Sequence, residues 1–443
     1  MMNMKQILCT VWVIACPLLV QAMDFREVYE AAEQNDARIR AARAAASAAR
    51  EKLPQAQAQR LPNVSFNAGV NRNHLTTSTT MNARPISYTY SYDSSNQVLQ
   101  LRQPLYRPYV GALVDQARAQ VEDANAVLES NEQDLLVRVA EAYFDALLAR
   151  EQLDLIAAQK TAYAAQLESA KKGFEAGVGV RTDIDDAQAR VDMTRALELE
   201  AAQNYEFTRH RLSVLVGRPV EALASLNAKG LRPGQPLPAS MDAWIAMAEQ
   251  NSPQLASLRA QLDSALMEIE KAKAGHKPTL DAVAGWSRSD SDSVTSVNTA
   301  YNQKFVGLQL SVPLYSGGYV NSTVRQAVAE SERAREALEA AQLELGSRVY
   351  EQYRAMTEGA LRISALEQAV RSAEQVVKSS RMSFKGGVRS IVDVLNAEQQ
   401  HVTALRDLAQ ARYAYLLAQV RLQSLAGKDR WATVDQANAY LTP

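Results

Sequence analysis

Residues 109–172 read YVGALVDQARAQVEDANAVLESNEQDLLVRVAEAYFDALLAREQLDLIAAQKTAYAAQLESAKK, and this stretch decides the fold. Glycine interrupts it once, at Gly111, and proline never does. Alanine, leucine, glutamate, glutamine and arginine dominate it, and all of these favour the α-helix. At a rise of 1.5 Å per residue, one helix of this length spans about 95 Å. That is far longer than a globular domain needs, so the sequence predicts an elongated, helix-rich protein.

Apolar residues recur at seven-residue spacing along this stretch, which predicts a partner helix and a left-handed supercoil. The positions of this seam are Val121, Leu128, Leu135, Ala142, Ala149, Ile156, Tyr163 and Ala170. A second apolar row, four residues further on, is imperfect because Asn125, Glu132 and Lys160 interrupt it. The seam is therefore expected to be buried against another helix.

The chain repeats itself about 210 residues later, so it consists of two copies of one unit. The motif AEQN at 32–35 recurs at 248–251, and PLY at 104–106 recurs at 313–315. A second long stretch, Tyr319–Lys385, contains two glycines and no proline and takes the place of the first. Each copy also contains a shorter helical stretch that ends near a glycine, as helices often do.

Between the helical stretches the hydrophobic period changes to two, which is the period of a β-strand. Val64, Phe66 and Val70 alternate with polar residues, and Leu280 to Trp286 alternate in the matching place. Strands are predicted at about 64–75 and 97–104 in the first copy and at about 279–290 and 304–313 in the second, with polar loops between them. Each copy is thus helix, hairpin, helix, helix.

These patterns divide the chain as follows. The first repeat is 23–216, with a long helix at about 108–173, a helical tip at 173–182 and a helix at 182–216. Residues 217–240, rich in proline and glycine, form an irregular linker. The second repeat is 241–427, with a long helix at about 318–385, a tip at 386–390 and a helix at 390–426. A C-terminal segment, 428–443, follows.

The first 22 residues resemble a secretory signal peptide. Lys5 precedes an apolar stretch from Ile7 to Val20, and the tripeptide VQA at 20–22 is a small-residue cleavage site. Both cysteines, Cys9 and Cys16, lie inside this segment, so the mature protein is expected to have no thiol. In an alternative interpretation, VIAC at 13–16 acts as a lipoprotein signal that leaves Cys16 lipidated.

No later apolar run is long enough for a membrane-spanning helix, so a membrane role would require the β-strands. A sheet in lipid must close on itself, and four strands are too few, so several chains would have to share one barrel. Two chains would give eight strands and three would give twelve, and this arithmetic does not choose between them. Five aromatic residues are candidates for an interfacial belt, with mobile loops as the alternative: Tyr88, Tyr90, Tyr92, Trp286 and Tyr301.

Several classes of function are excluded by composition and pattern. The formal net charge of −1, with acidic and basic residues interspersed, provides no concentrated basic face for nucleic acid. The four histidines, His74, His210, His276 and His401, are isolated from one another, and no metal, phosphate-loop or nucleophile motif is present. We therefore expect no catalytic residues, no metal and no cofactor. A secreted coiled-coil adhesin or fibre is the alternative from another class.

The chain resembles the TolC family of outer-membrane factors over nearly all of its mature length. The resemblance rests on the duplicated plan, on PLYSGG at 313–318, on GVRSIVDVLNA at 387–397 and on ARYAYL at 411–416. It implies an α+β membrane protein, a homotrimer with a twelve-strand outer-membrane β-barrel, four strands per chain, and a long periplasmic α-helical barrel. It also implies a passive exit duct for efflux or type I secretion, with outer-membrane lipid, a periplasmic adaptor (membrane fusion protein) and an ABC or RND inner-membrane transporter as partners.

The resemblance also implies a periplasmic gate at the two helical tips. Asp393 would form a ring of three carboxylates by threefold symmetry, although a residue three positions after Ser390 is also a typical first-turn acid of a helix. Arg389 would pair with Asp183, the position of a family latch acid, with Arg181 beside the other tip. Two positions depart from the family: Phe384 replaces a tyrosine and Asn396 replaces an acid.

Overall fold

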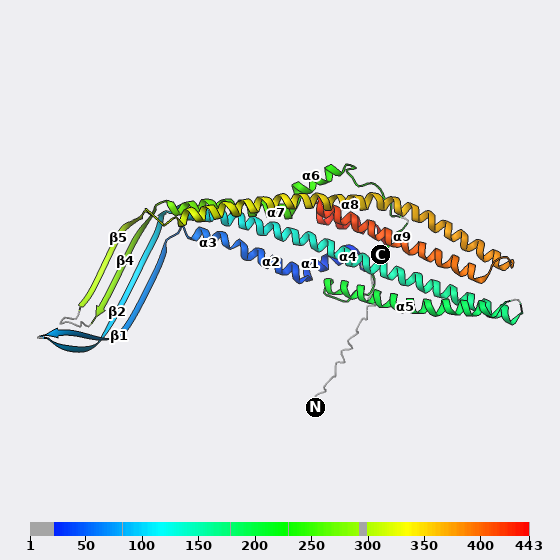
Figure 1. Cartoon of the computed structure of the whole chain (residues 1–443), viewed down its shortest axis with the longest axis horizontal. Helices are drawn as coiled ribbons and strands as arrows, with labels where there is room; N and C mark the ends of the chain where they lie inside the picture. Colours follow the sequence, from blue (N-terminus) through cyan, green and yellow to red (C-terminus); the bar gives the residue numbers. More distant parts are fainter. Residues whose placement is uncertain (1–21, 82, 178, 229, 292–298, 443) are drawn as a thin grey trace, which may run out of the picture. The chain divides into compact units, whose positions relative to one another are not determined.

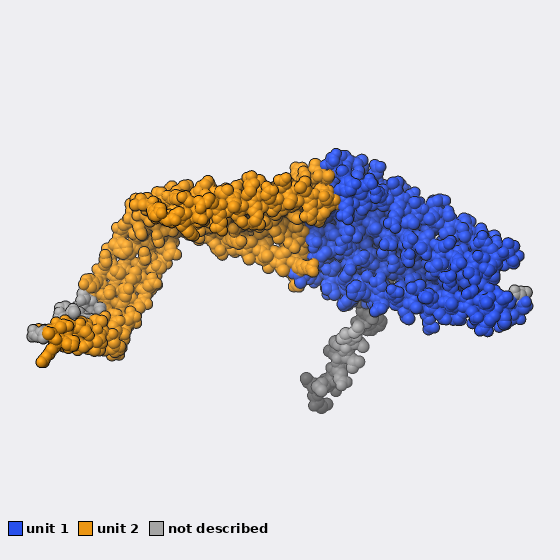
Figure 2. All heavy atoms as spheres, viewed as in Figure 1, with its two compact units in different colours: residues 1–37, 133–244, 349–443 blue, residues 38–132, 245–348 orange. Residues whose placement is uncertain are grey.

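The computed structural model describes residues 22–81, 83–177, 179–228, 230–291 and 299–442. Cys9, Cys16 and the rest of the predicted signal up to residue 21 lie outside these ranges. The described chain forms two compact units, distinguished by colour in Figure 2. Unit 1 comprises residues up to 37 with 133–244 and 349–443, and unit 2 comprises 38–132 and 245–348. Each unit combines segments of both sequence repeats, so the compact units are not the repeats themselves.

Four helices dominate the chain, and Figure 1 labels them α4 (Pro108–Glu175), α5 (Arg181–Val216), α8 (Tyr319–Lys385) and α9 (Ile391–Leu425). The shorter helices are α1 (Phe25–Asn35), α2 (Ala37–Arg50), α3 (Lys52–Ala58), α6 (Met241–Asn251), α7 (Pro253–Lys273), the 3₁₀ turn η1 (Ala274–His276) and α10 (Arg430–Asn438). The boundary between the units runs through α4 at 132/133 and through α8 at 348/349.

Local sequence explains where these helices begin and end. Ser252 caps α7 by accepting a hydrogen bond from the backbone N of Leu255, and Pro253 occupies the first turn, where its missing N–H costs nothing. Helix α5 ends at Gly217, whose φ of 77° is the left-handed conformation that glycine adopts most easily. Gly427 ends α9 in the same way, with φ of 64°.

The core of unit 1 forms where α4 meets the N-terminal and C-terminal helices. Phe25 is fully buried, with its ring 5.5 Å from that of Tyr143 and 5.8 Å from that of Phe144. Phe144 in turn lies 6.2 Å from Tyr413 of α9. Seam positions Leu135, Ala142, Ala149, Tyr163 and Ala170 of α4 are all buried. The heptad face of this half of α4 therefore supplies core contacts.

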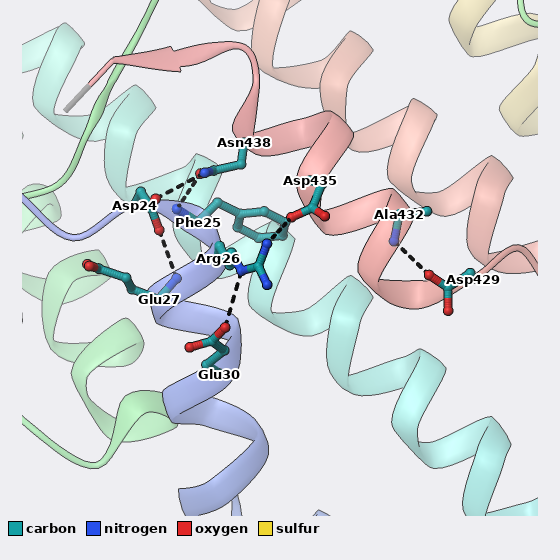
Figure 3. Close-up of polar contacts among 9 residues, drawn as sticks. All are labelled: Asp24, Phe25, Arg26, Glu27, Glu30, Asp429, Ala432, Asp435 and Asn438. Atoms are coloured by element: carbon teal, nitrogen blue, oxygen red, sulfur yellow. Dashed lines mark hydrogen bonds and ion pairs between the residues drawn. The ribbon is translucent and has the colours of Figure 1, made fainter.

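Helices α1 and α10 are fastened to each other by polar contacts, shown in Figure 3. The side chain of Asn438 accepts from the backbone N of Phe25 at 3.1 Å and donates to Asp24 at 3.0 Å. Arg26 pairs with Asp435 at 2.8 Å. We call this contact the terminal clamp. It holds segments from opposite ends of the described chain in one unit.

The linker at 217–240 follows a defined path over unit 1. Its strand β3 (Ser225–Leu226) pairs with β6 (Leu441–Thr442), and Met23 forms a bridge with Leu223. Further along, Gly234 donates its backbone N–H to the Tyr415 hydroxyl at 3.1 Å. The predicted irregular connection is therefore attached to the helices beneath it by hydrogen bonds.

Unit 2 contains one antiparallel sheet in the order β1 (Asn63–Met81), β2 (Arg84–Tyr106), β4 (Thr279–Ser291) and β5 (Thr299–Ser311). The first hairpin extends beyond the predicted strands, which ended near residue 75 and began again near 97. Threonine and tyrosine favour strands even where the pattern is polar. Hydroxyl pairs such as Thr76 with Thr89, 3.1 Å apart, join the two strands in the added length.

Residues that pair directly across an antiparallel sheet share a face, so the register shows which residues lie on each face of the sheet. Val64 pairs with Leu101, Leu101 with Ala284, and Ala284 with Val306. The next row joins Phe66, Leu99 and Trp286. This apolar face is exposed in the single chain, and Val306 retains 88% of its accessible surface. No described helix is both long enough and apolar enough to cross a membrane.

All five aromatic residues of the predicted belt lie in strands rather than in loops, and the register divides them between the two faces of the sheet. Trp286 lies on the apolar face, but Tyr88, Tyr90 and Tyr92 pair with Thr77, Leu75 and Asn73, which point to the other face. Tyr301 pairs with Ser289 and also lies on the other face. Composition indicated aromatic residues near the strand ends, but only the register determines the face on which each one lies.

Candidate functional site at the two helical tips

The first tip joins α4 to α5 within unit 1. The backbone N of Gly177 donates to the carbonyl of Phe174 at 3.0 Å, and Gly179 donates to Gly173 at 3.1 Å. Gly177 has a φ of 75°, a left-handed backbone conformation that glycine adopts without strain. Val180 precedes α5 and provides no side-chain cap. Val178, also in this tip, lies outside the described residues.

The second tip joins α8 to α9 and closes with the same geometry. Gly387 has a φ of 75° and donates to the carbonyl of Phe384 at 3.0 Å, as Gly177 does to Phe174. The second tip differs from the first at the start of the helix that follows it. Ser390 caps α9, and Asp393 accepts in return from the backbone N of Ser390, which completes a capping box. The described residues thus show a side-chain cap at the start of α9 and none at the start of α5.

Asp393 is exposed, and its carboxylate is held by Ser390. The hydroxyl of Ser390 donates to Asp393 Oδ2 at 2.9 Å, and the backbone N of Ser390 donates to the same oxygen at 3.0 Å. These hydrogen bonds lower the pKa of Asp393 below its ordinary value, and the nearby charge of Arg389 adds to the effect. The predicted first-turn role is thus present in the structure. The side chain remains ionised and exposed at neutral pH.

Arg389 does not pair with Asp183 within this chain. Its Nη1 donates to the Oγ of Ser380 at 2.9 Å, and Ser380 is fully buried. At the other tip, Arg181 pairs with Asp185 at 3.2 Å, four residues along the same helix. Each arginine is therefore bound within its own hairpin. An Arg389 to Asp183 pair would have to form between subunits.

Phe384 packs its ring against an apolar cluster beneath the tips. The fully buried members come from α4, α5 and α9, and Tyr163, Ala187 and Leu395 represent the three helices. A tyrosine at position 384 would carry a hydroxyl at the edge of this cluster, whereas phenylalanine contributes only apolar contact. Phe384 therefore takes part in the cluster through its ring alone.

Asn396 connects the two hairpins through a neutral hydrogen bond. Its side-chain oxygen accepts from Nη2 of Arg190, on α5, at 2.9 Å. A carboxylate at position 396 would convert this contact into an ion pair, which is stronger and depends on salt. The amide therefore links α5 to α9 without adding a charge to the tip.

A buried acid at the second tip was not predicted. Glu398 is only 5% exposed, and its Oε1 accepts from Nε of Arg381 at 3.0 Å and from Nη2 at 2.7 Å. The other oxygen, Oε2, is buried and has no hydrogen-bond partner in the described chain. Glu398 follows Ile391 and Leu395 at helical spacing, so the sequence did place an acid on the buried face of α9.

A polar network lies deeper between α4 and α9. Gln159 is buried, and its Nε2 donates to the Tyr163 hydroxyl at 2.9 Å and to Gln399 Oε1 at 2.8 Å. Burial raises the pKa of Tyr163, so its phenol remains protonated. Within the described residues, no three histidine, cysteine or acidic side chains gather as metal ligands. The described tips thus bring together exposed charged side chains and an apolar cluster.

Comparison with known proteins gives a consistent result. The family model described as outer membrane efflux protein matches residues 28–218 and 244–428. An alkaline protease secretion protein of Pseudomonas aeruginosa, AprF, is 36% identical over 92% of this chain and 85% of its own length. A proteases secretion protein of Dickeya chrysanthemi, PrtF, is 33% identical over 96% and 93%. TolC of Vibrio cholerae is 31% identical over 95% and 94%.

Solved structures agree on the fold. CusC superposes with a TM-score of 0.78 at 17% identity and covers 92% of both chains. The outer membrane protein VceC from Vibrio cholerae superposes with a TM-score of 0.74 at 18% identity and covers 91% of this chain and 96% of its own. At these identities the likeness concerns the arrangement of helices and strands alone.

Proposed function

This chain belongs to the outer membrane efflux protein family and is an exit duct of the outer membrane that extends into the periplasm, and we propose that its cargo is polypeptide. The observation that carries the proposal is its similarity to two protease secretion proteins, at 36% and 33% identity, over more than nine-tenths of the chain. Small-solute efflux is the second candidate, because the family description names efflux. The adhesin or fibre alternative does not agree with this membership.

We infer that the working form is a homotrimer whose sheets close into one twelve-strand barrel. The four-stranded sheet has β1 and β5 at its edges in the described chain, and its apolar face is exposed. In lipid, unpaired backbone groups at those edges would be costly, so the edges of neighbouring copies should pair. Two copies would give eight strands and three would give twelve, both even, so the choice of three rests on membership of a family of homotrimeric channels.

The energy for export should come from partners. We expect a periplasmic adaptor and an inner-membrane transporter of the ABC type, because the proposed cargo is protein. We also infer that the chain is not an enzyme. An RND-type transporter would accompany the alternative cargo of small solutes.

We assign the periplasmic gate to the two tips. Asp393 supports this role because it is exposed and ionised, and three copies around an axis would favour cations over anions. Arg389, Arg181 and Asp183 lie at or next to the same tips. An intersubunit pair between Arg389 and Asp183 would form only if Arg389 exchanged its contact with Ser380 for the neighbour.

One experiment tests cargo and architecture together. The chain is expressed in a strain that lacks its own exit duct but retains a protease with its ABC transporter and adaptor. We expect protease in the medium, no change in resistance to small toxic solutes, and a trimer by light scattering in detergent. Restored solute resistance without protease secretion would favour the second candidate, and a folded monomer in lipid would contradict the barrel.

A further inference from the structure

The first β-hairpin reverses its amphipathic pattern along its length, and this reversal points to a contact surface. Near the helices the apolar residues, from Val64 to Val70, occupy one face, which we call the outer face. Beyond Val70 the same face becomes polar. Arg72 faces Asp93 at 3.8 Å, and His74 Nδ1 lies 2.7 Å from the Ser91 hydroxyl.

Beyond the same point the opposite face becomes aromatic. Tyr88, Tyr90 and Tyr92 are spaced two residues apart on β2, so they form one row, which we call the tyrosine row. The rings of Tyr88 and Tyr90 are stacked, with centroids 6.4 Å apart. Leu75, directly opposite Tyr90, adds to the row. All of these residues belong to unit 2 and to one continuous register.

The position of the tyrosine row follows from the proposed function, on which this inference rests. If the outer face meets lipid near the helices, then the opposite face borders the passage through which cargo leaves. The row begins three residues beyond Val70, where the outer face has lost its apolar residues. It therefore lies past the apolar band, at the outward end of the hairpin.

We propose that the tyrosine row is a contact surface for extended, uncharged segments of the exported polypeptide. Tyrosine presents a flat apolar ring with a polar edge, which suits brief contact with many sequences. No charged side chain lies on this face between Asn71 and Thr79 or between Ile86 and Asn96, whereas Arg72 and Asp93 lie on the other face. A surface without charge neither repels nor holds positively or negatively charged segments of the cargo.

The test uses single-channel current through the full-length protein in a planar bilayer. The probe is a disordered glycine and serine peptide with interspersed phenylalanines, and the same peptide without phenylalanine is the reference. Changing all three tyrosines to serine should shorten the blocks caused by the phenylalanine peptide about tenfold, to the level of the reference peptide. Changing them to phenylalanine should preserve the long blocks. The matched control converts Ser95 and Gln97, on the outer face of the same strand, to alanine and should leave the blocks unchanged.

Two results would overturn the proposal. One is an unchanged block time in the serine variant, because the rings would then not contact the peptide. The other is a severalfold rise in the conductance of the empty channel, because the row would then seal the exit between subunits rather than contact cargo. A parent protein that carries no current would instead contradict the proposed duct, and this outcome differs from both.

Discussion

Arg389 donates a hydrogen bond from Nη1 to the Oγ of Ser380 at 2.9 Å, so the arginine expected to reach a neighbouring tip is bound to its own hairpin. Ser380 is fully buried, which fixes one end of the contact. The guanidinium group of Arg389 therefore stabilises one conformation of the connection between α8 and α9. A gate that opens by separating tips would have to keep or replace this contact.

Removing either partner of this contact should loosen the second tip. A hydrogen bond to a charged donor contributes about 1 kcal/mol or more, so Arg389→Ala and Ser380→Ala should each raise open-channel conductance about fivefold. The double variant should add little, because both changes remove the same contact. Planar-bilayer conductance provides the measurement, with Arg371→Ala as the control, because Arg371 bonds to Gln368 on the same helix. An effect of Asp183→Asn equal to that of Arg389→Ala, with none from Ser380→Ala, would favour the intersubunit pair instead.

Arg381→Met should destabilise the protein because it leaves the buried carboxylate of Glu398 without its partner. A buried polar group that loses its hydrogen bonds costs about 1–3 kcal/mol, and a charged one costs more. Urea denaturation, followed by circular dichroism, would show a lower midpoint. The double variant Arg381→Met with Glu398→Met should recover most of the loss, since two apolar groups need no partners. A double variant as unstable as the single one would mean that packing, not charge, explains the effect.

Asp393→Asn removes the charge at the second tip and keeps the helix cap, so it tests the two roles of Asp393 independently. Asparagine can still accept from the backbone of Ser390, so the start of α9 should remain intact. Cation preference in asymmetric salt should nevertheless weaken, because the proposed ring of three negative charges is gone. Asp393→Ala should lose both the selectivity and part of the cap. An asparagine variant as selective as the parent would remove Asp393 from the gate.

Glu151→Gln tests an acid whose pKa is raised by burial, although the Tyr413 hydroxyl and Arg412 oppose the shift. The folded chain binds this proton more tightly than the unfolded chain does. Stability should therefore rise as the pH falls from neutral through the raised pKa, and the gain should be complete near the ordinary value of 4.5. The glutamine variant should melt at a higher temperature at neutral pH and gain less on acidification. A parallel pH profile in both proteins would contradict the assignment.

The helices and the general fold could be predicted because α4 and α8 carry almost no glycine or proline over more than sixty residues each. The faces of the hairpin could not be predicted so well. Tyr88, Tyr90 and Tyr92 lie in a polar context that composition assigns equally to a loop or to a belt. The pairing of Tyr90 with Leu75 determines on which face of the sheet the three tyrosines lie, and this pairing depends on the whole register of β1 and β2.

The tips show a similar division. The left-handed glycines at 177 and 387 and the cap at Ser390 could be expected from residue type alone. The partner of Arg389 could not, because it depends on how the tip returns the chain toward Ser380. Glu398 was overlooked although its helical spacing with Leu395 placed it on the buried face, because acids are usually expected on solvated faces.

The terminal clamp sets a condition on the timing of folding. Asp24 and Asn438 are 414 positions apart, and the backbone N of Phe25 also donates to Asn438. We therefore expect unit 1 to complete its packing only after residue 438 has crossed the cytoplasmic membrane. A chain in transit must stay unfolded, and in need of protection from proteases and aggregation, until nearly all of it has been delivered. We expect docking of α10 onto α1 to complete this contact once Asn438 has been delivered.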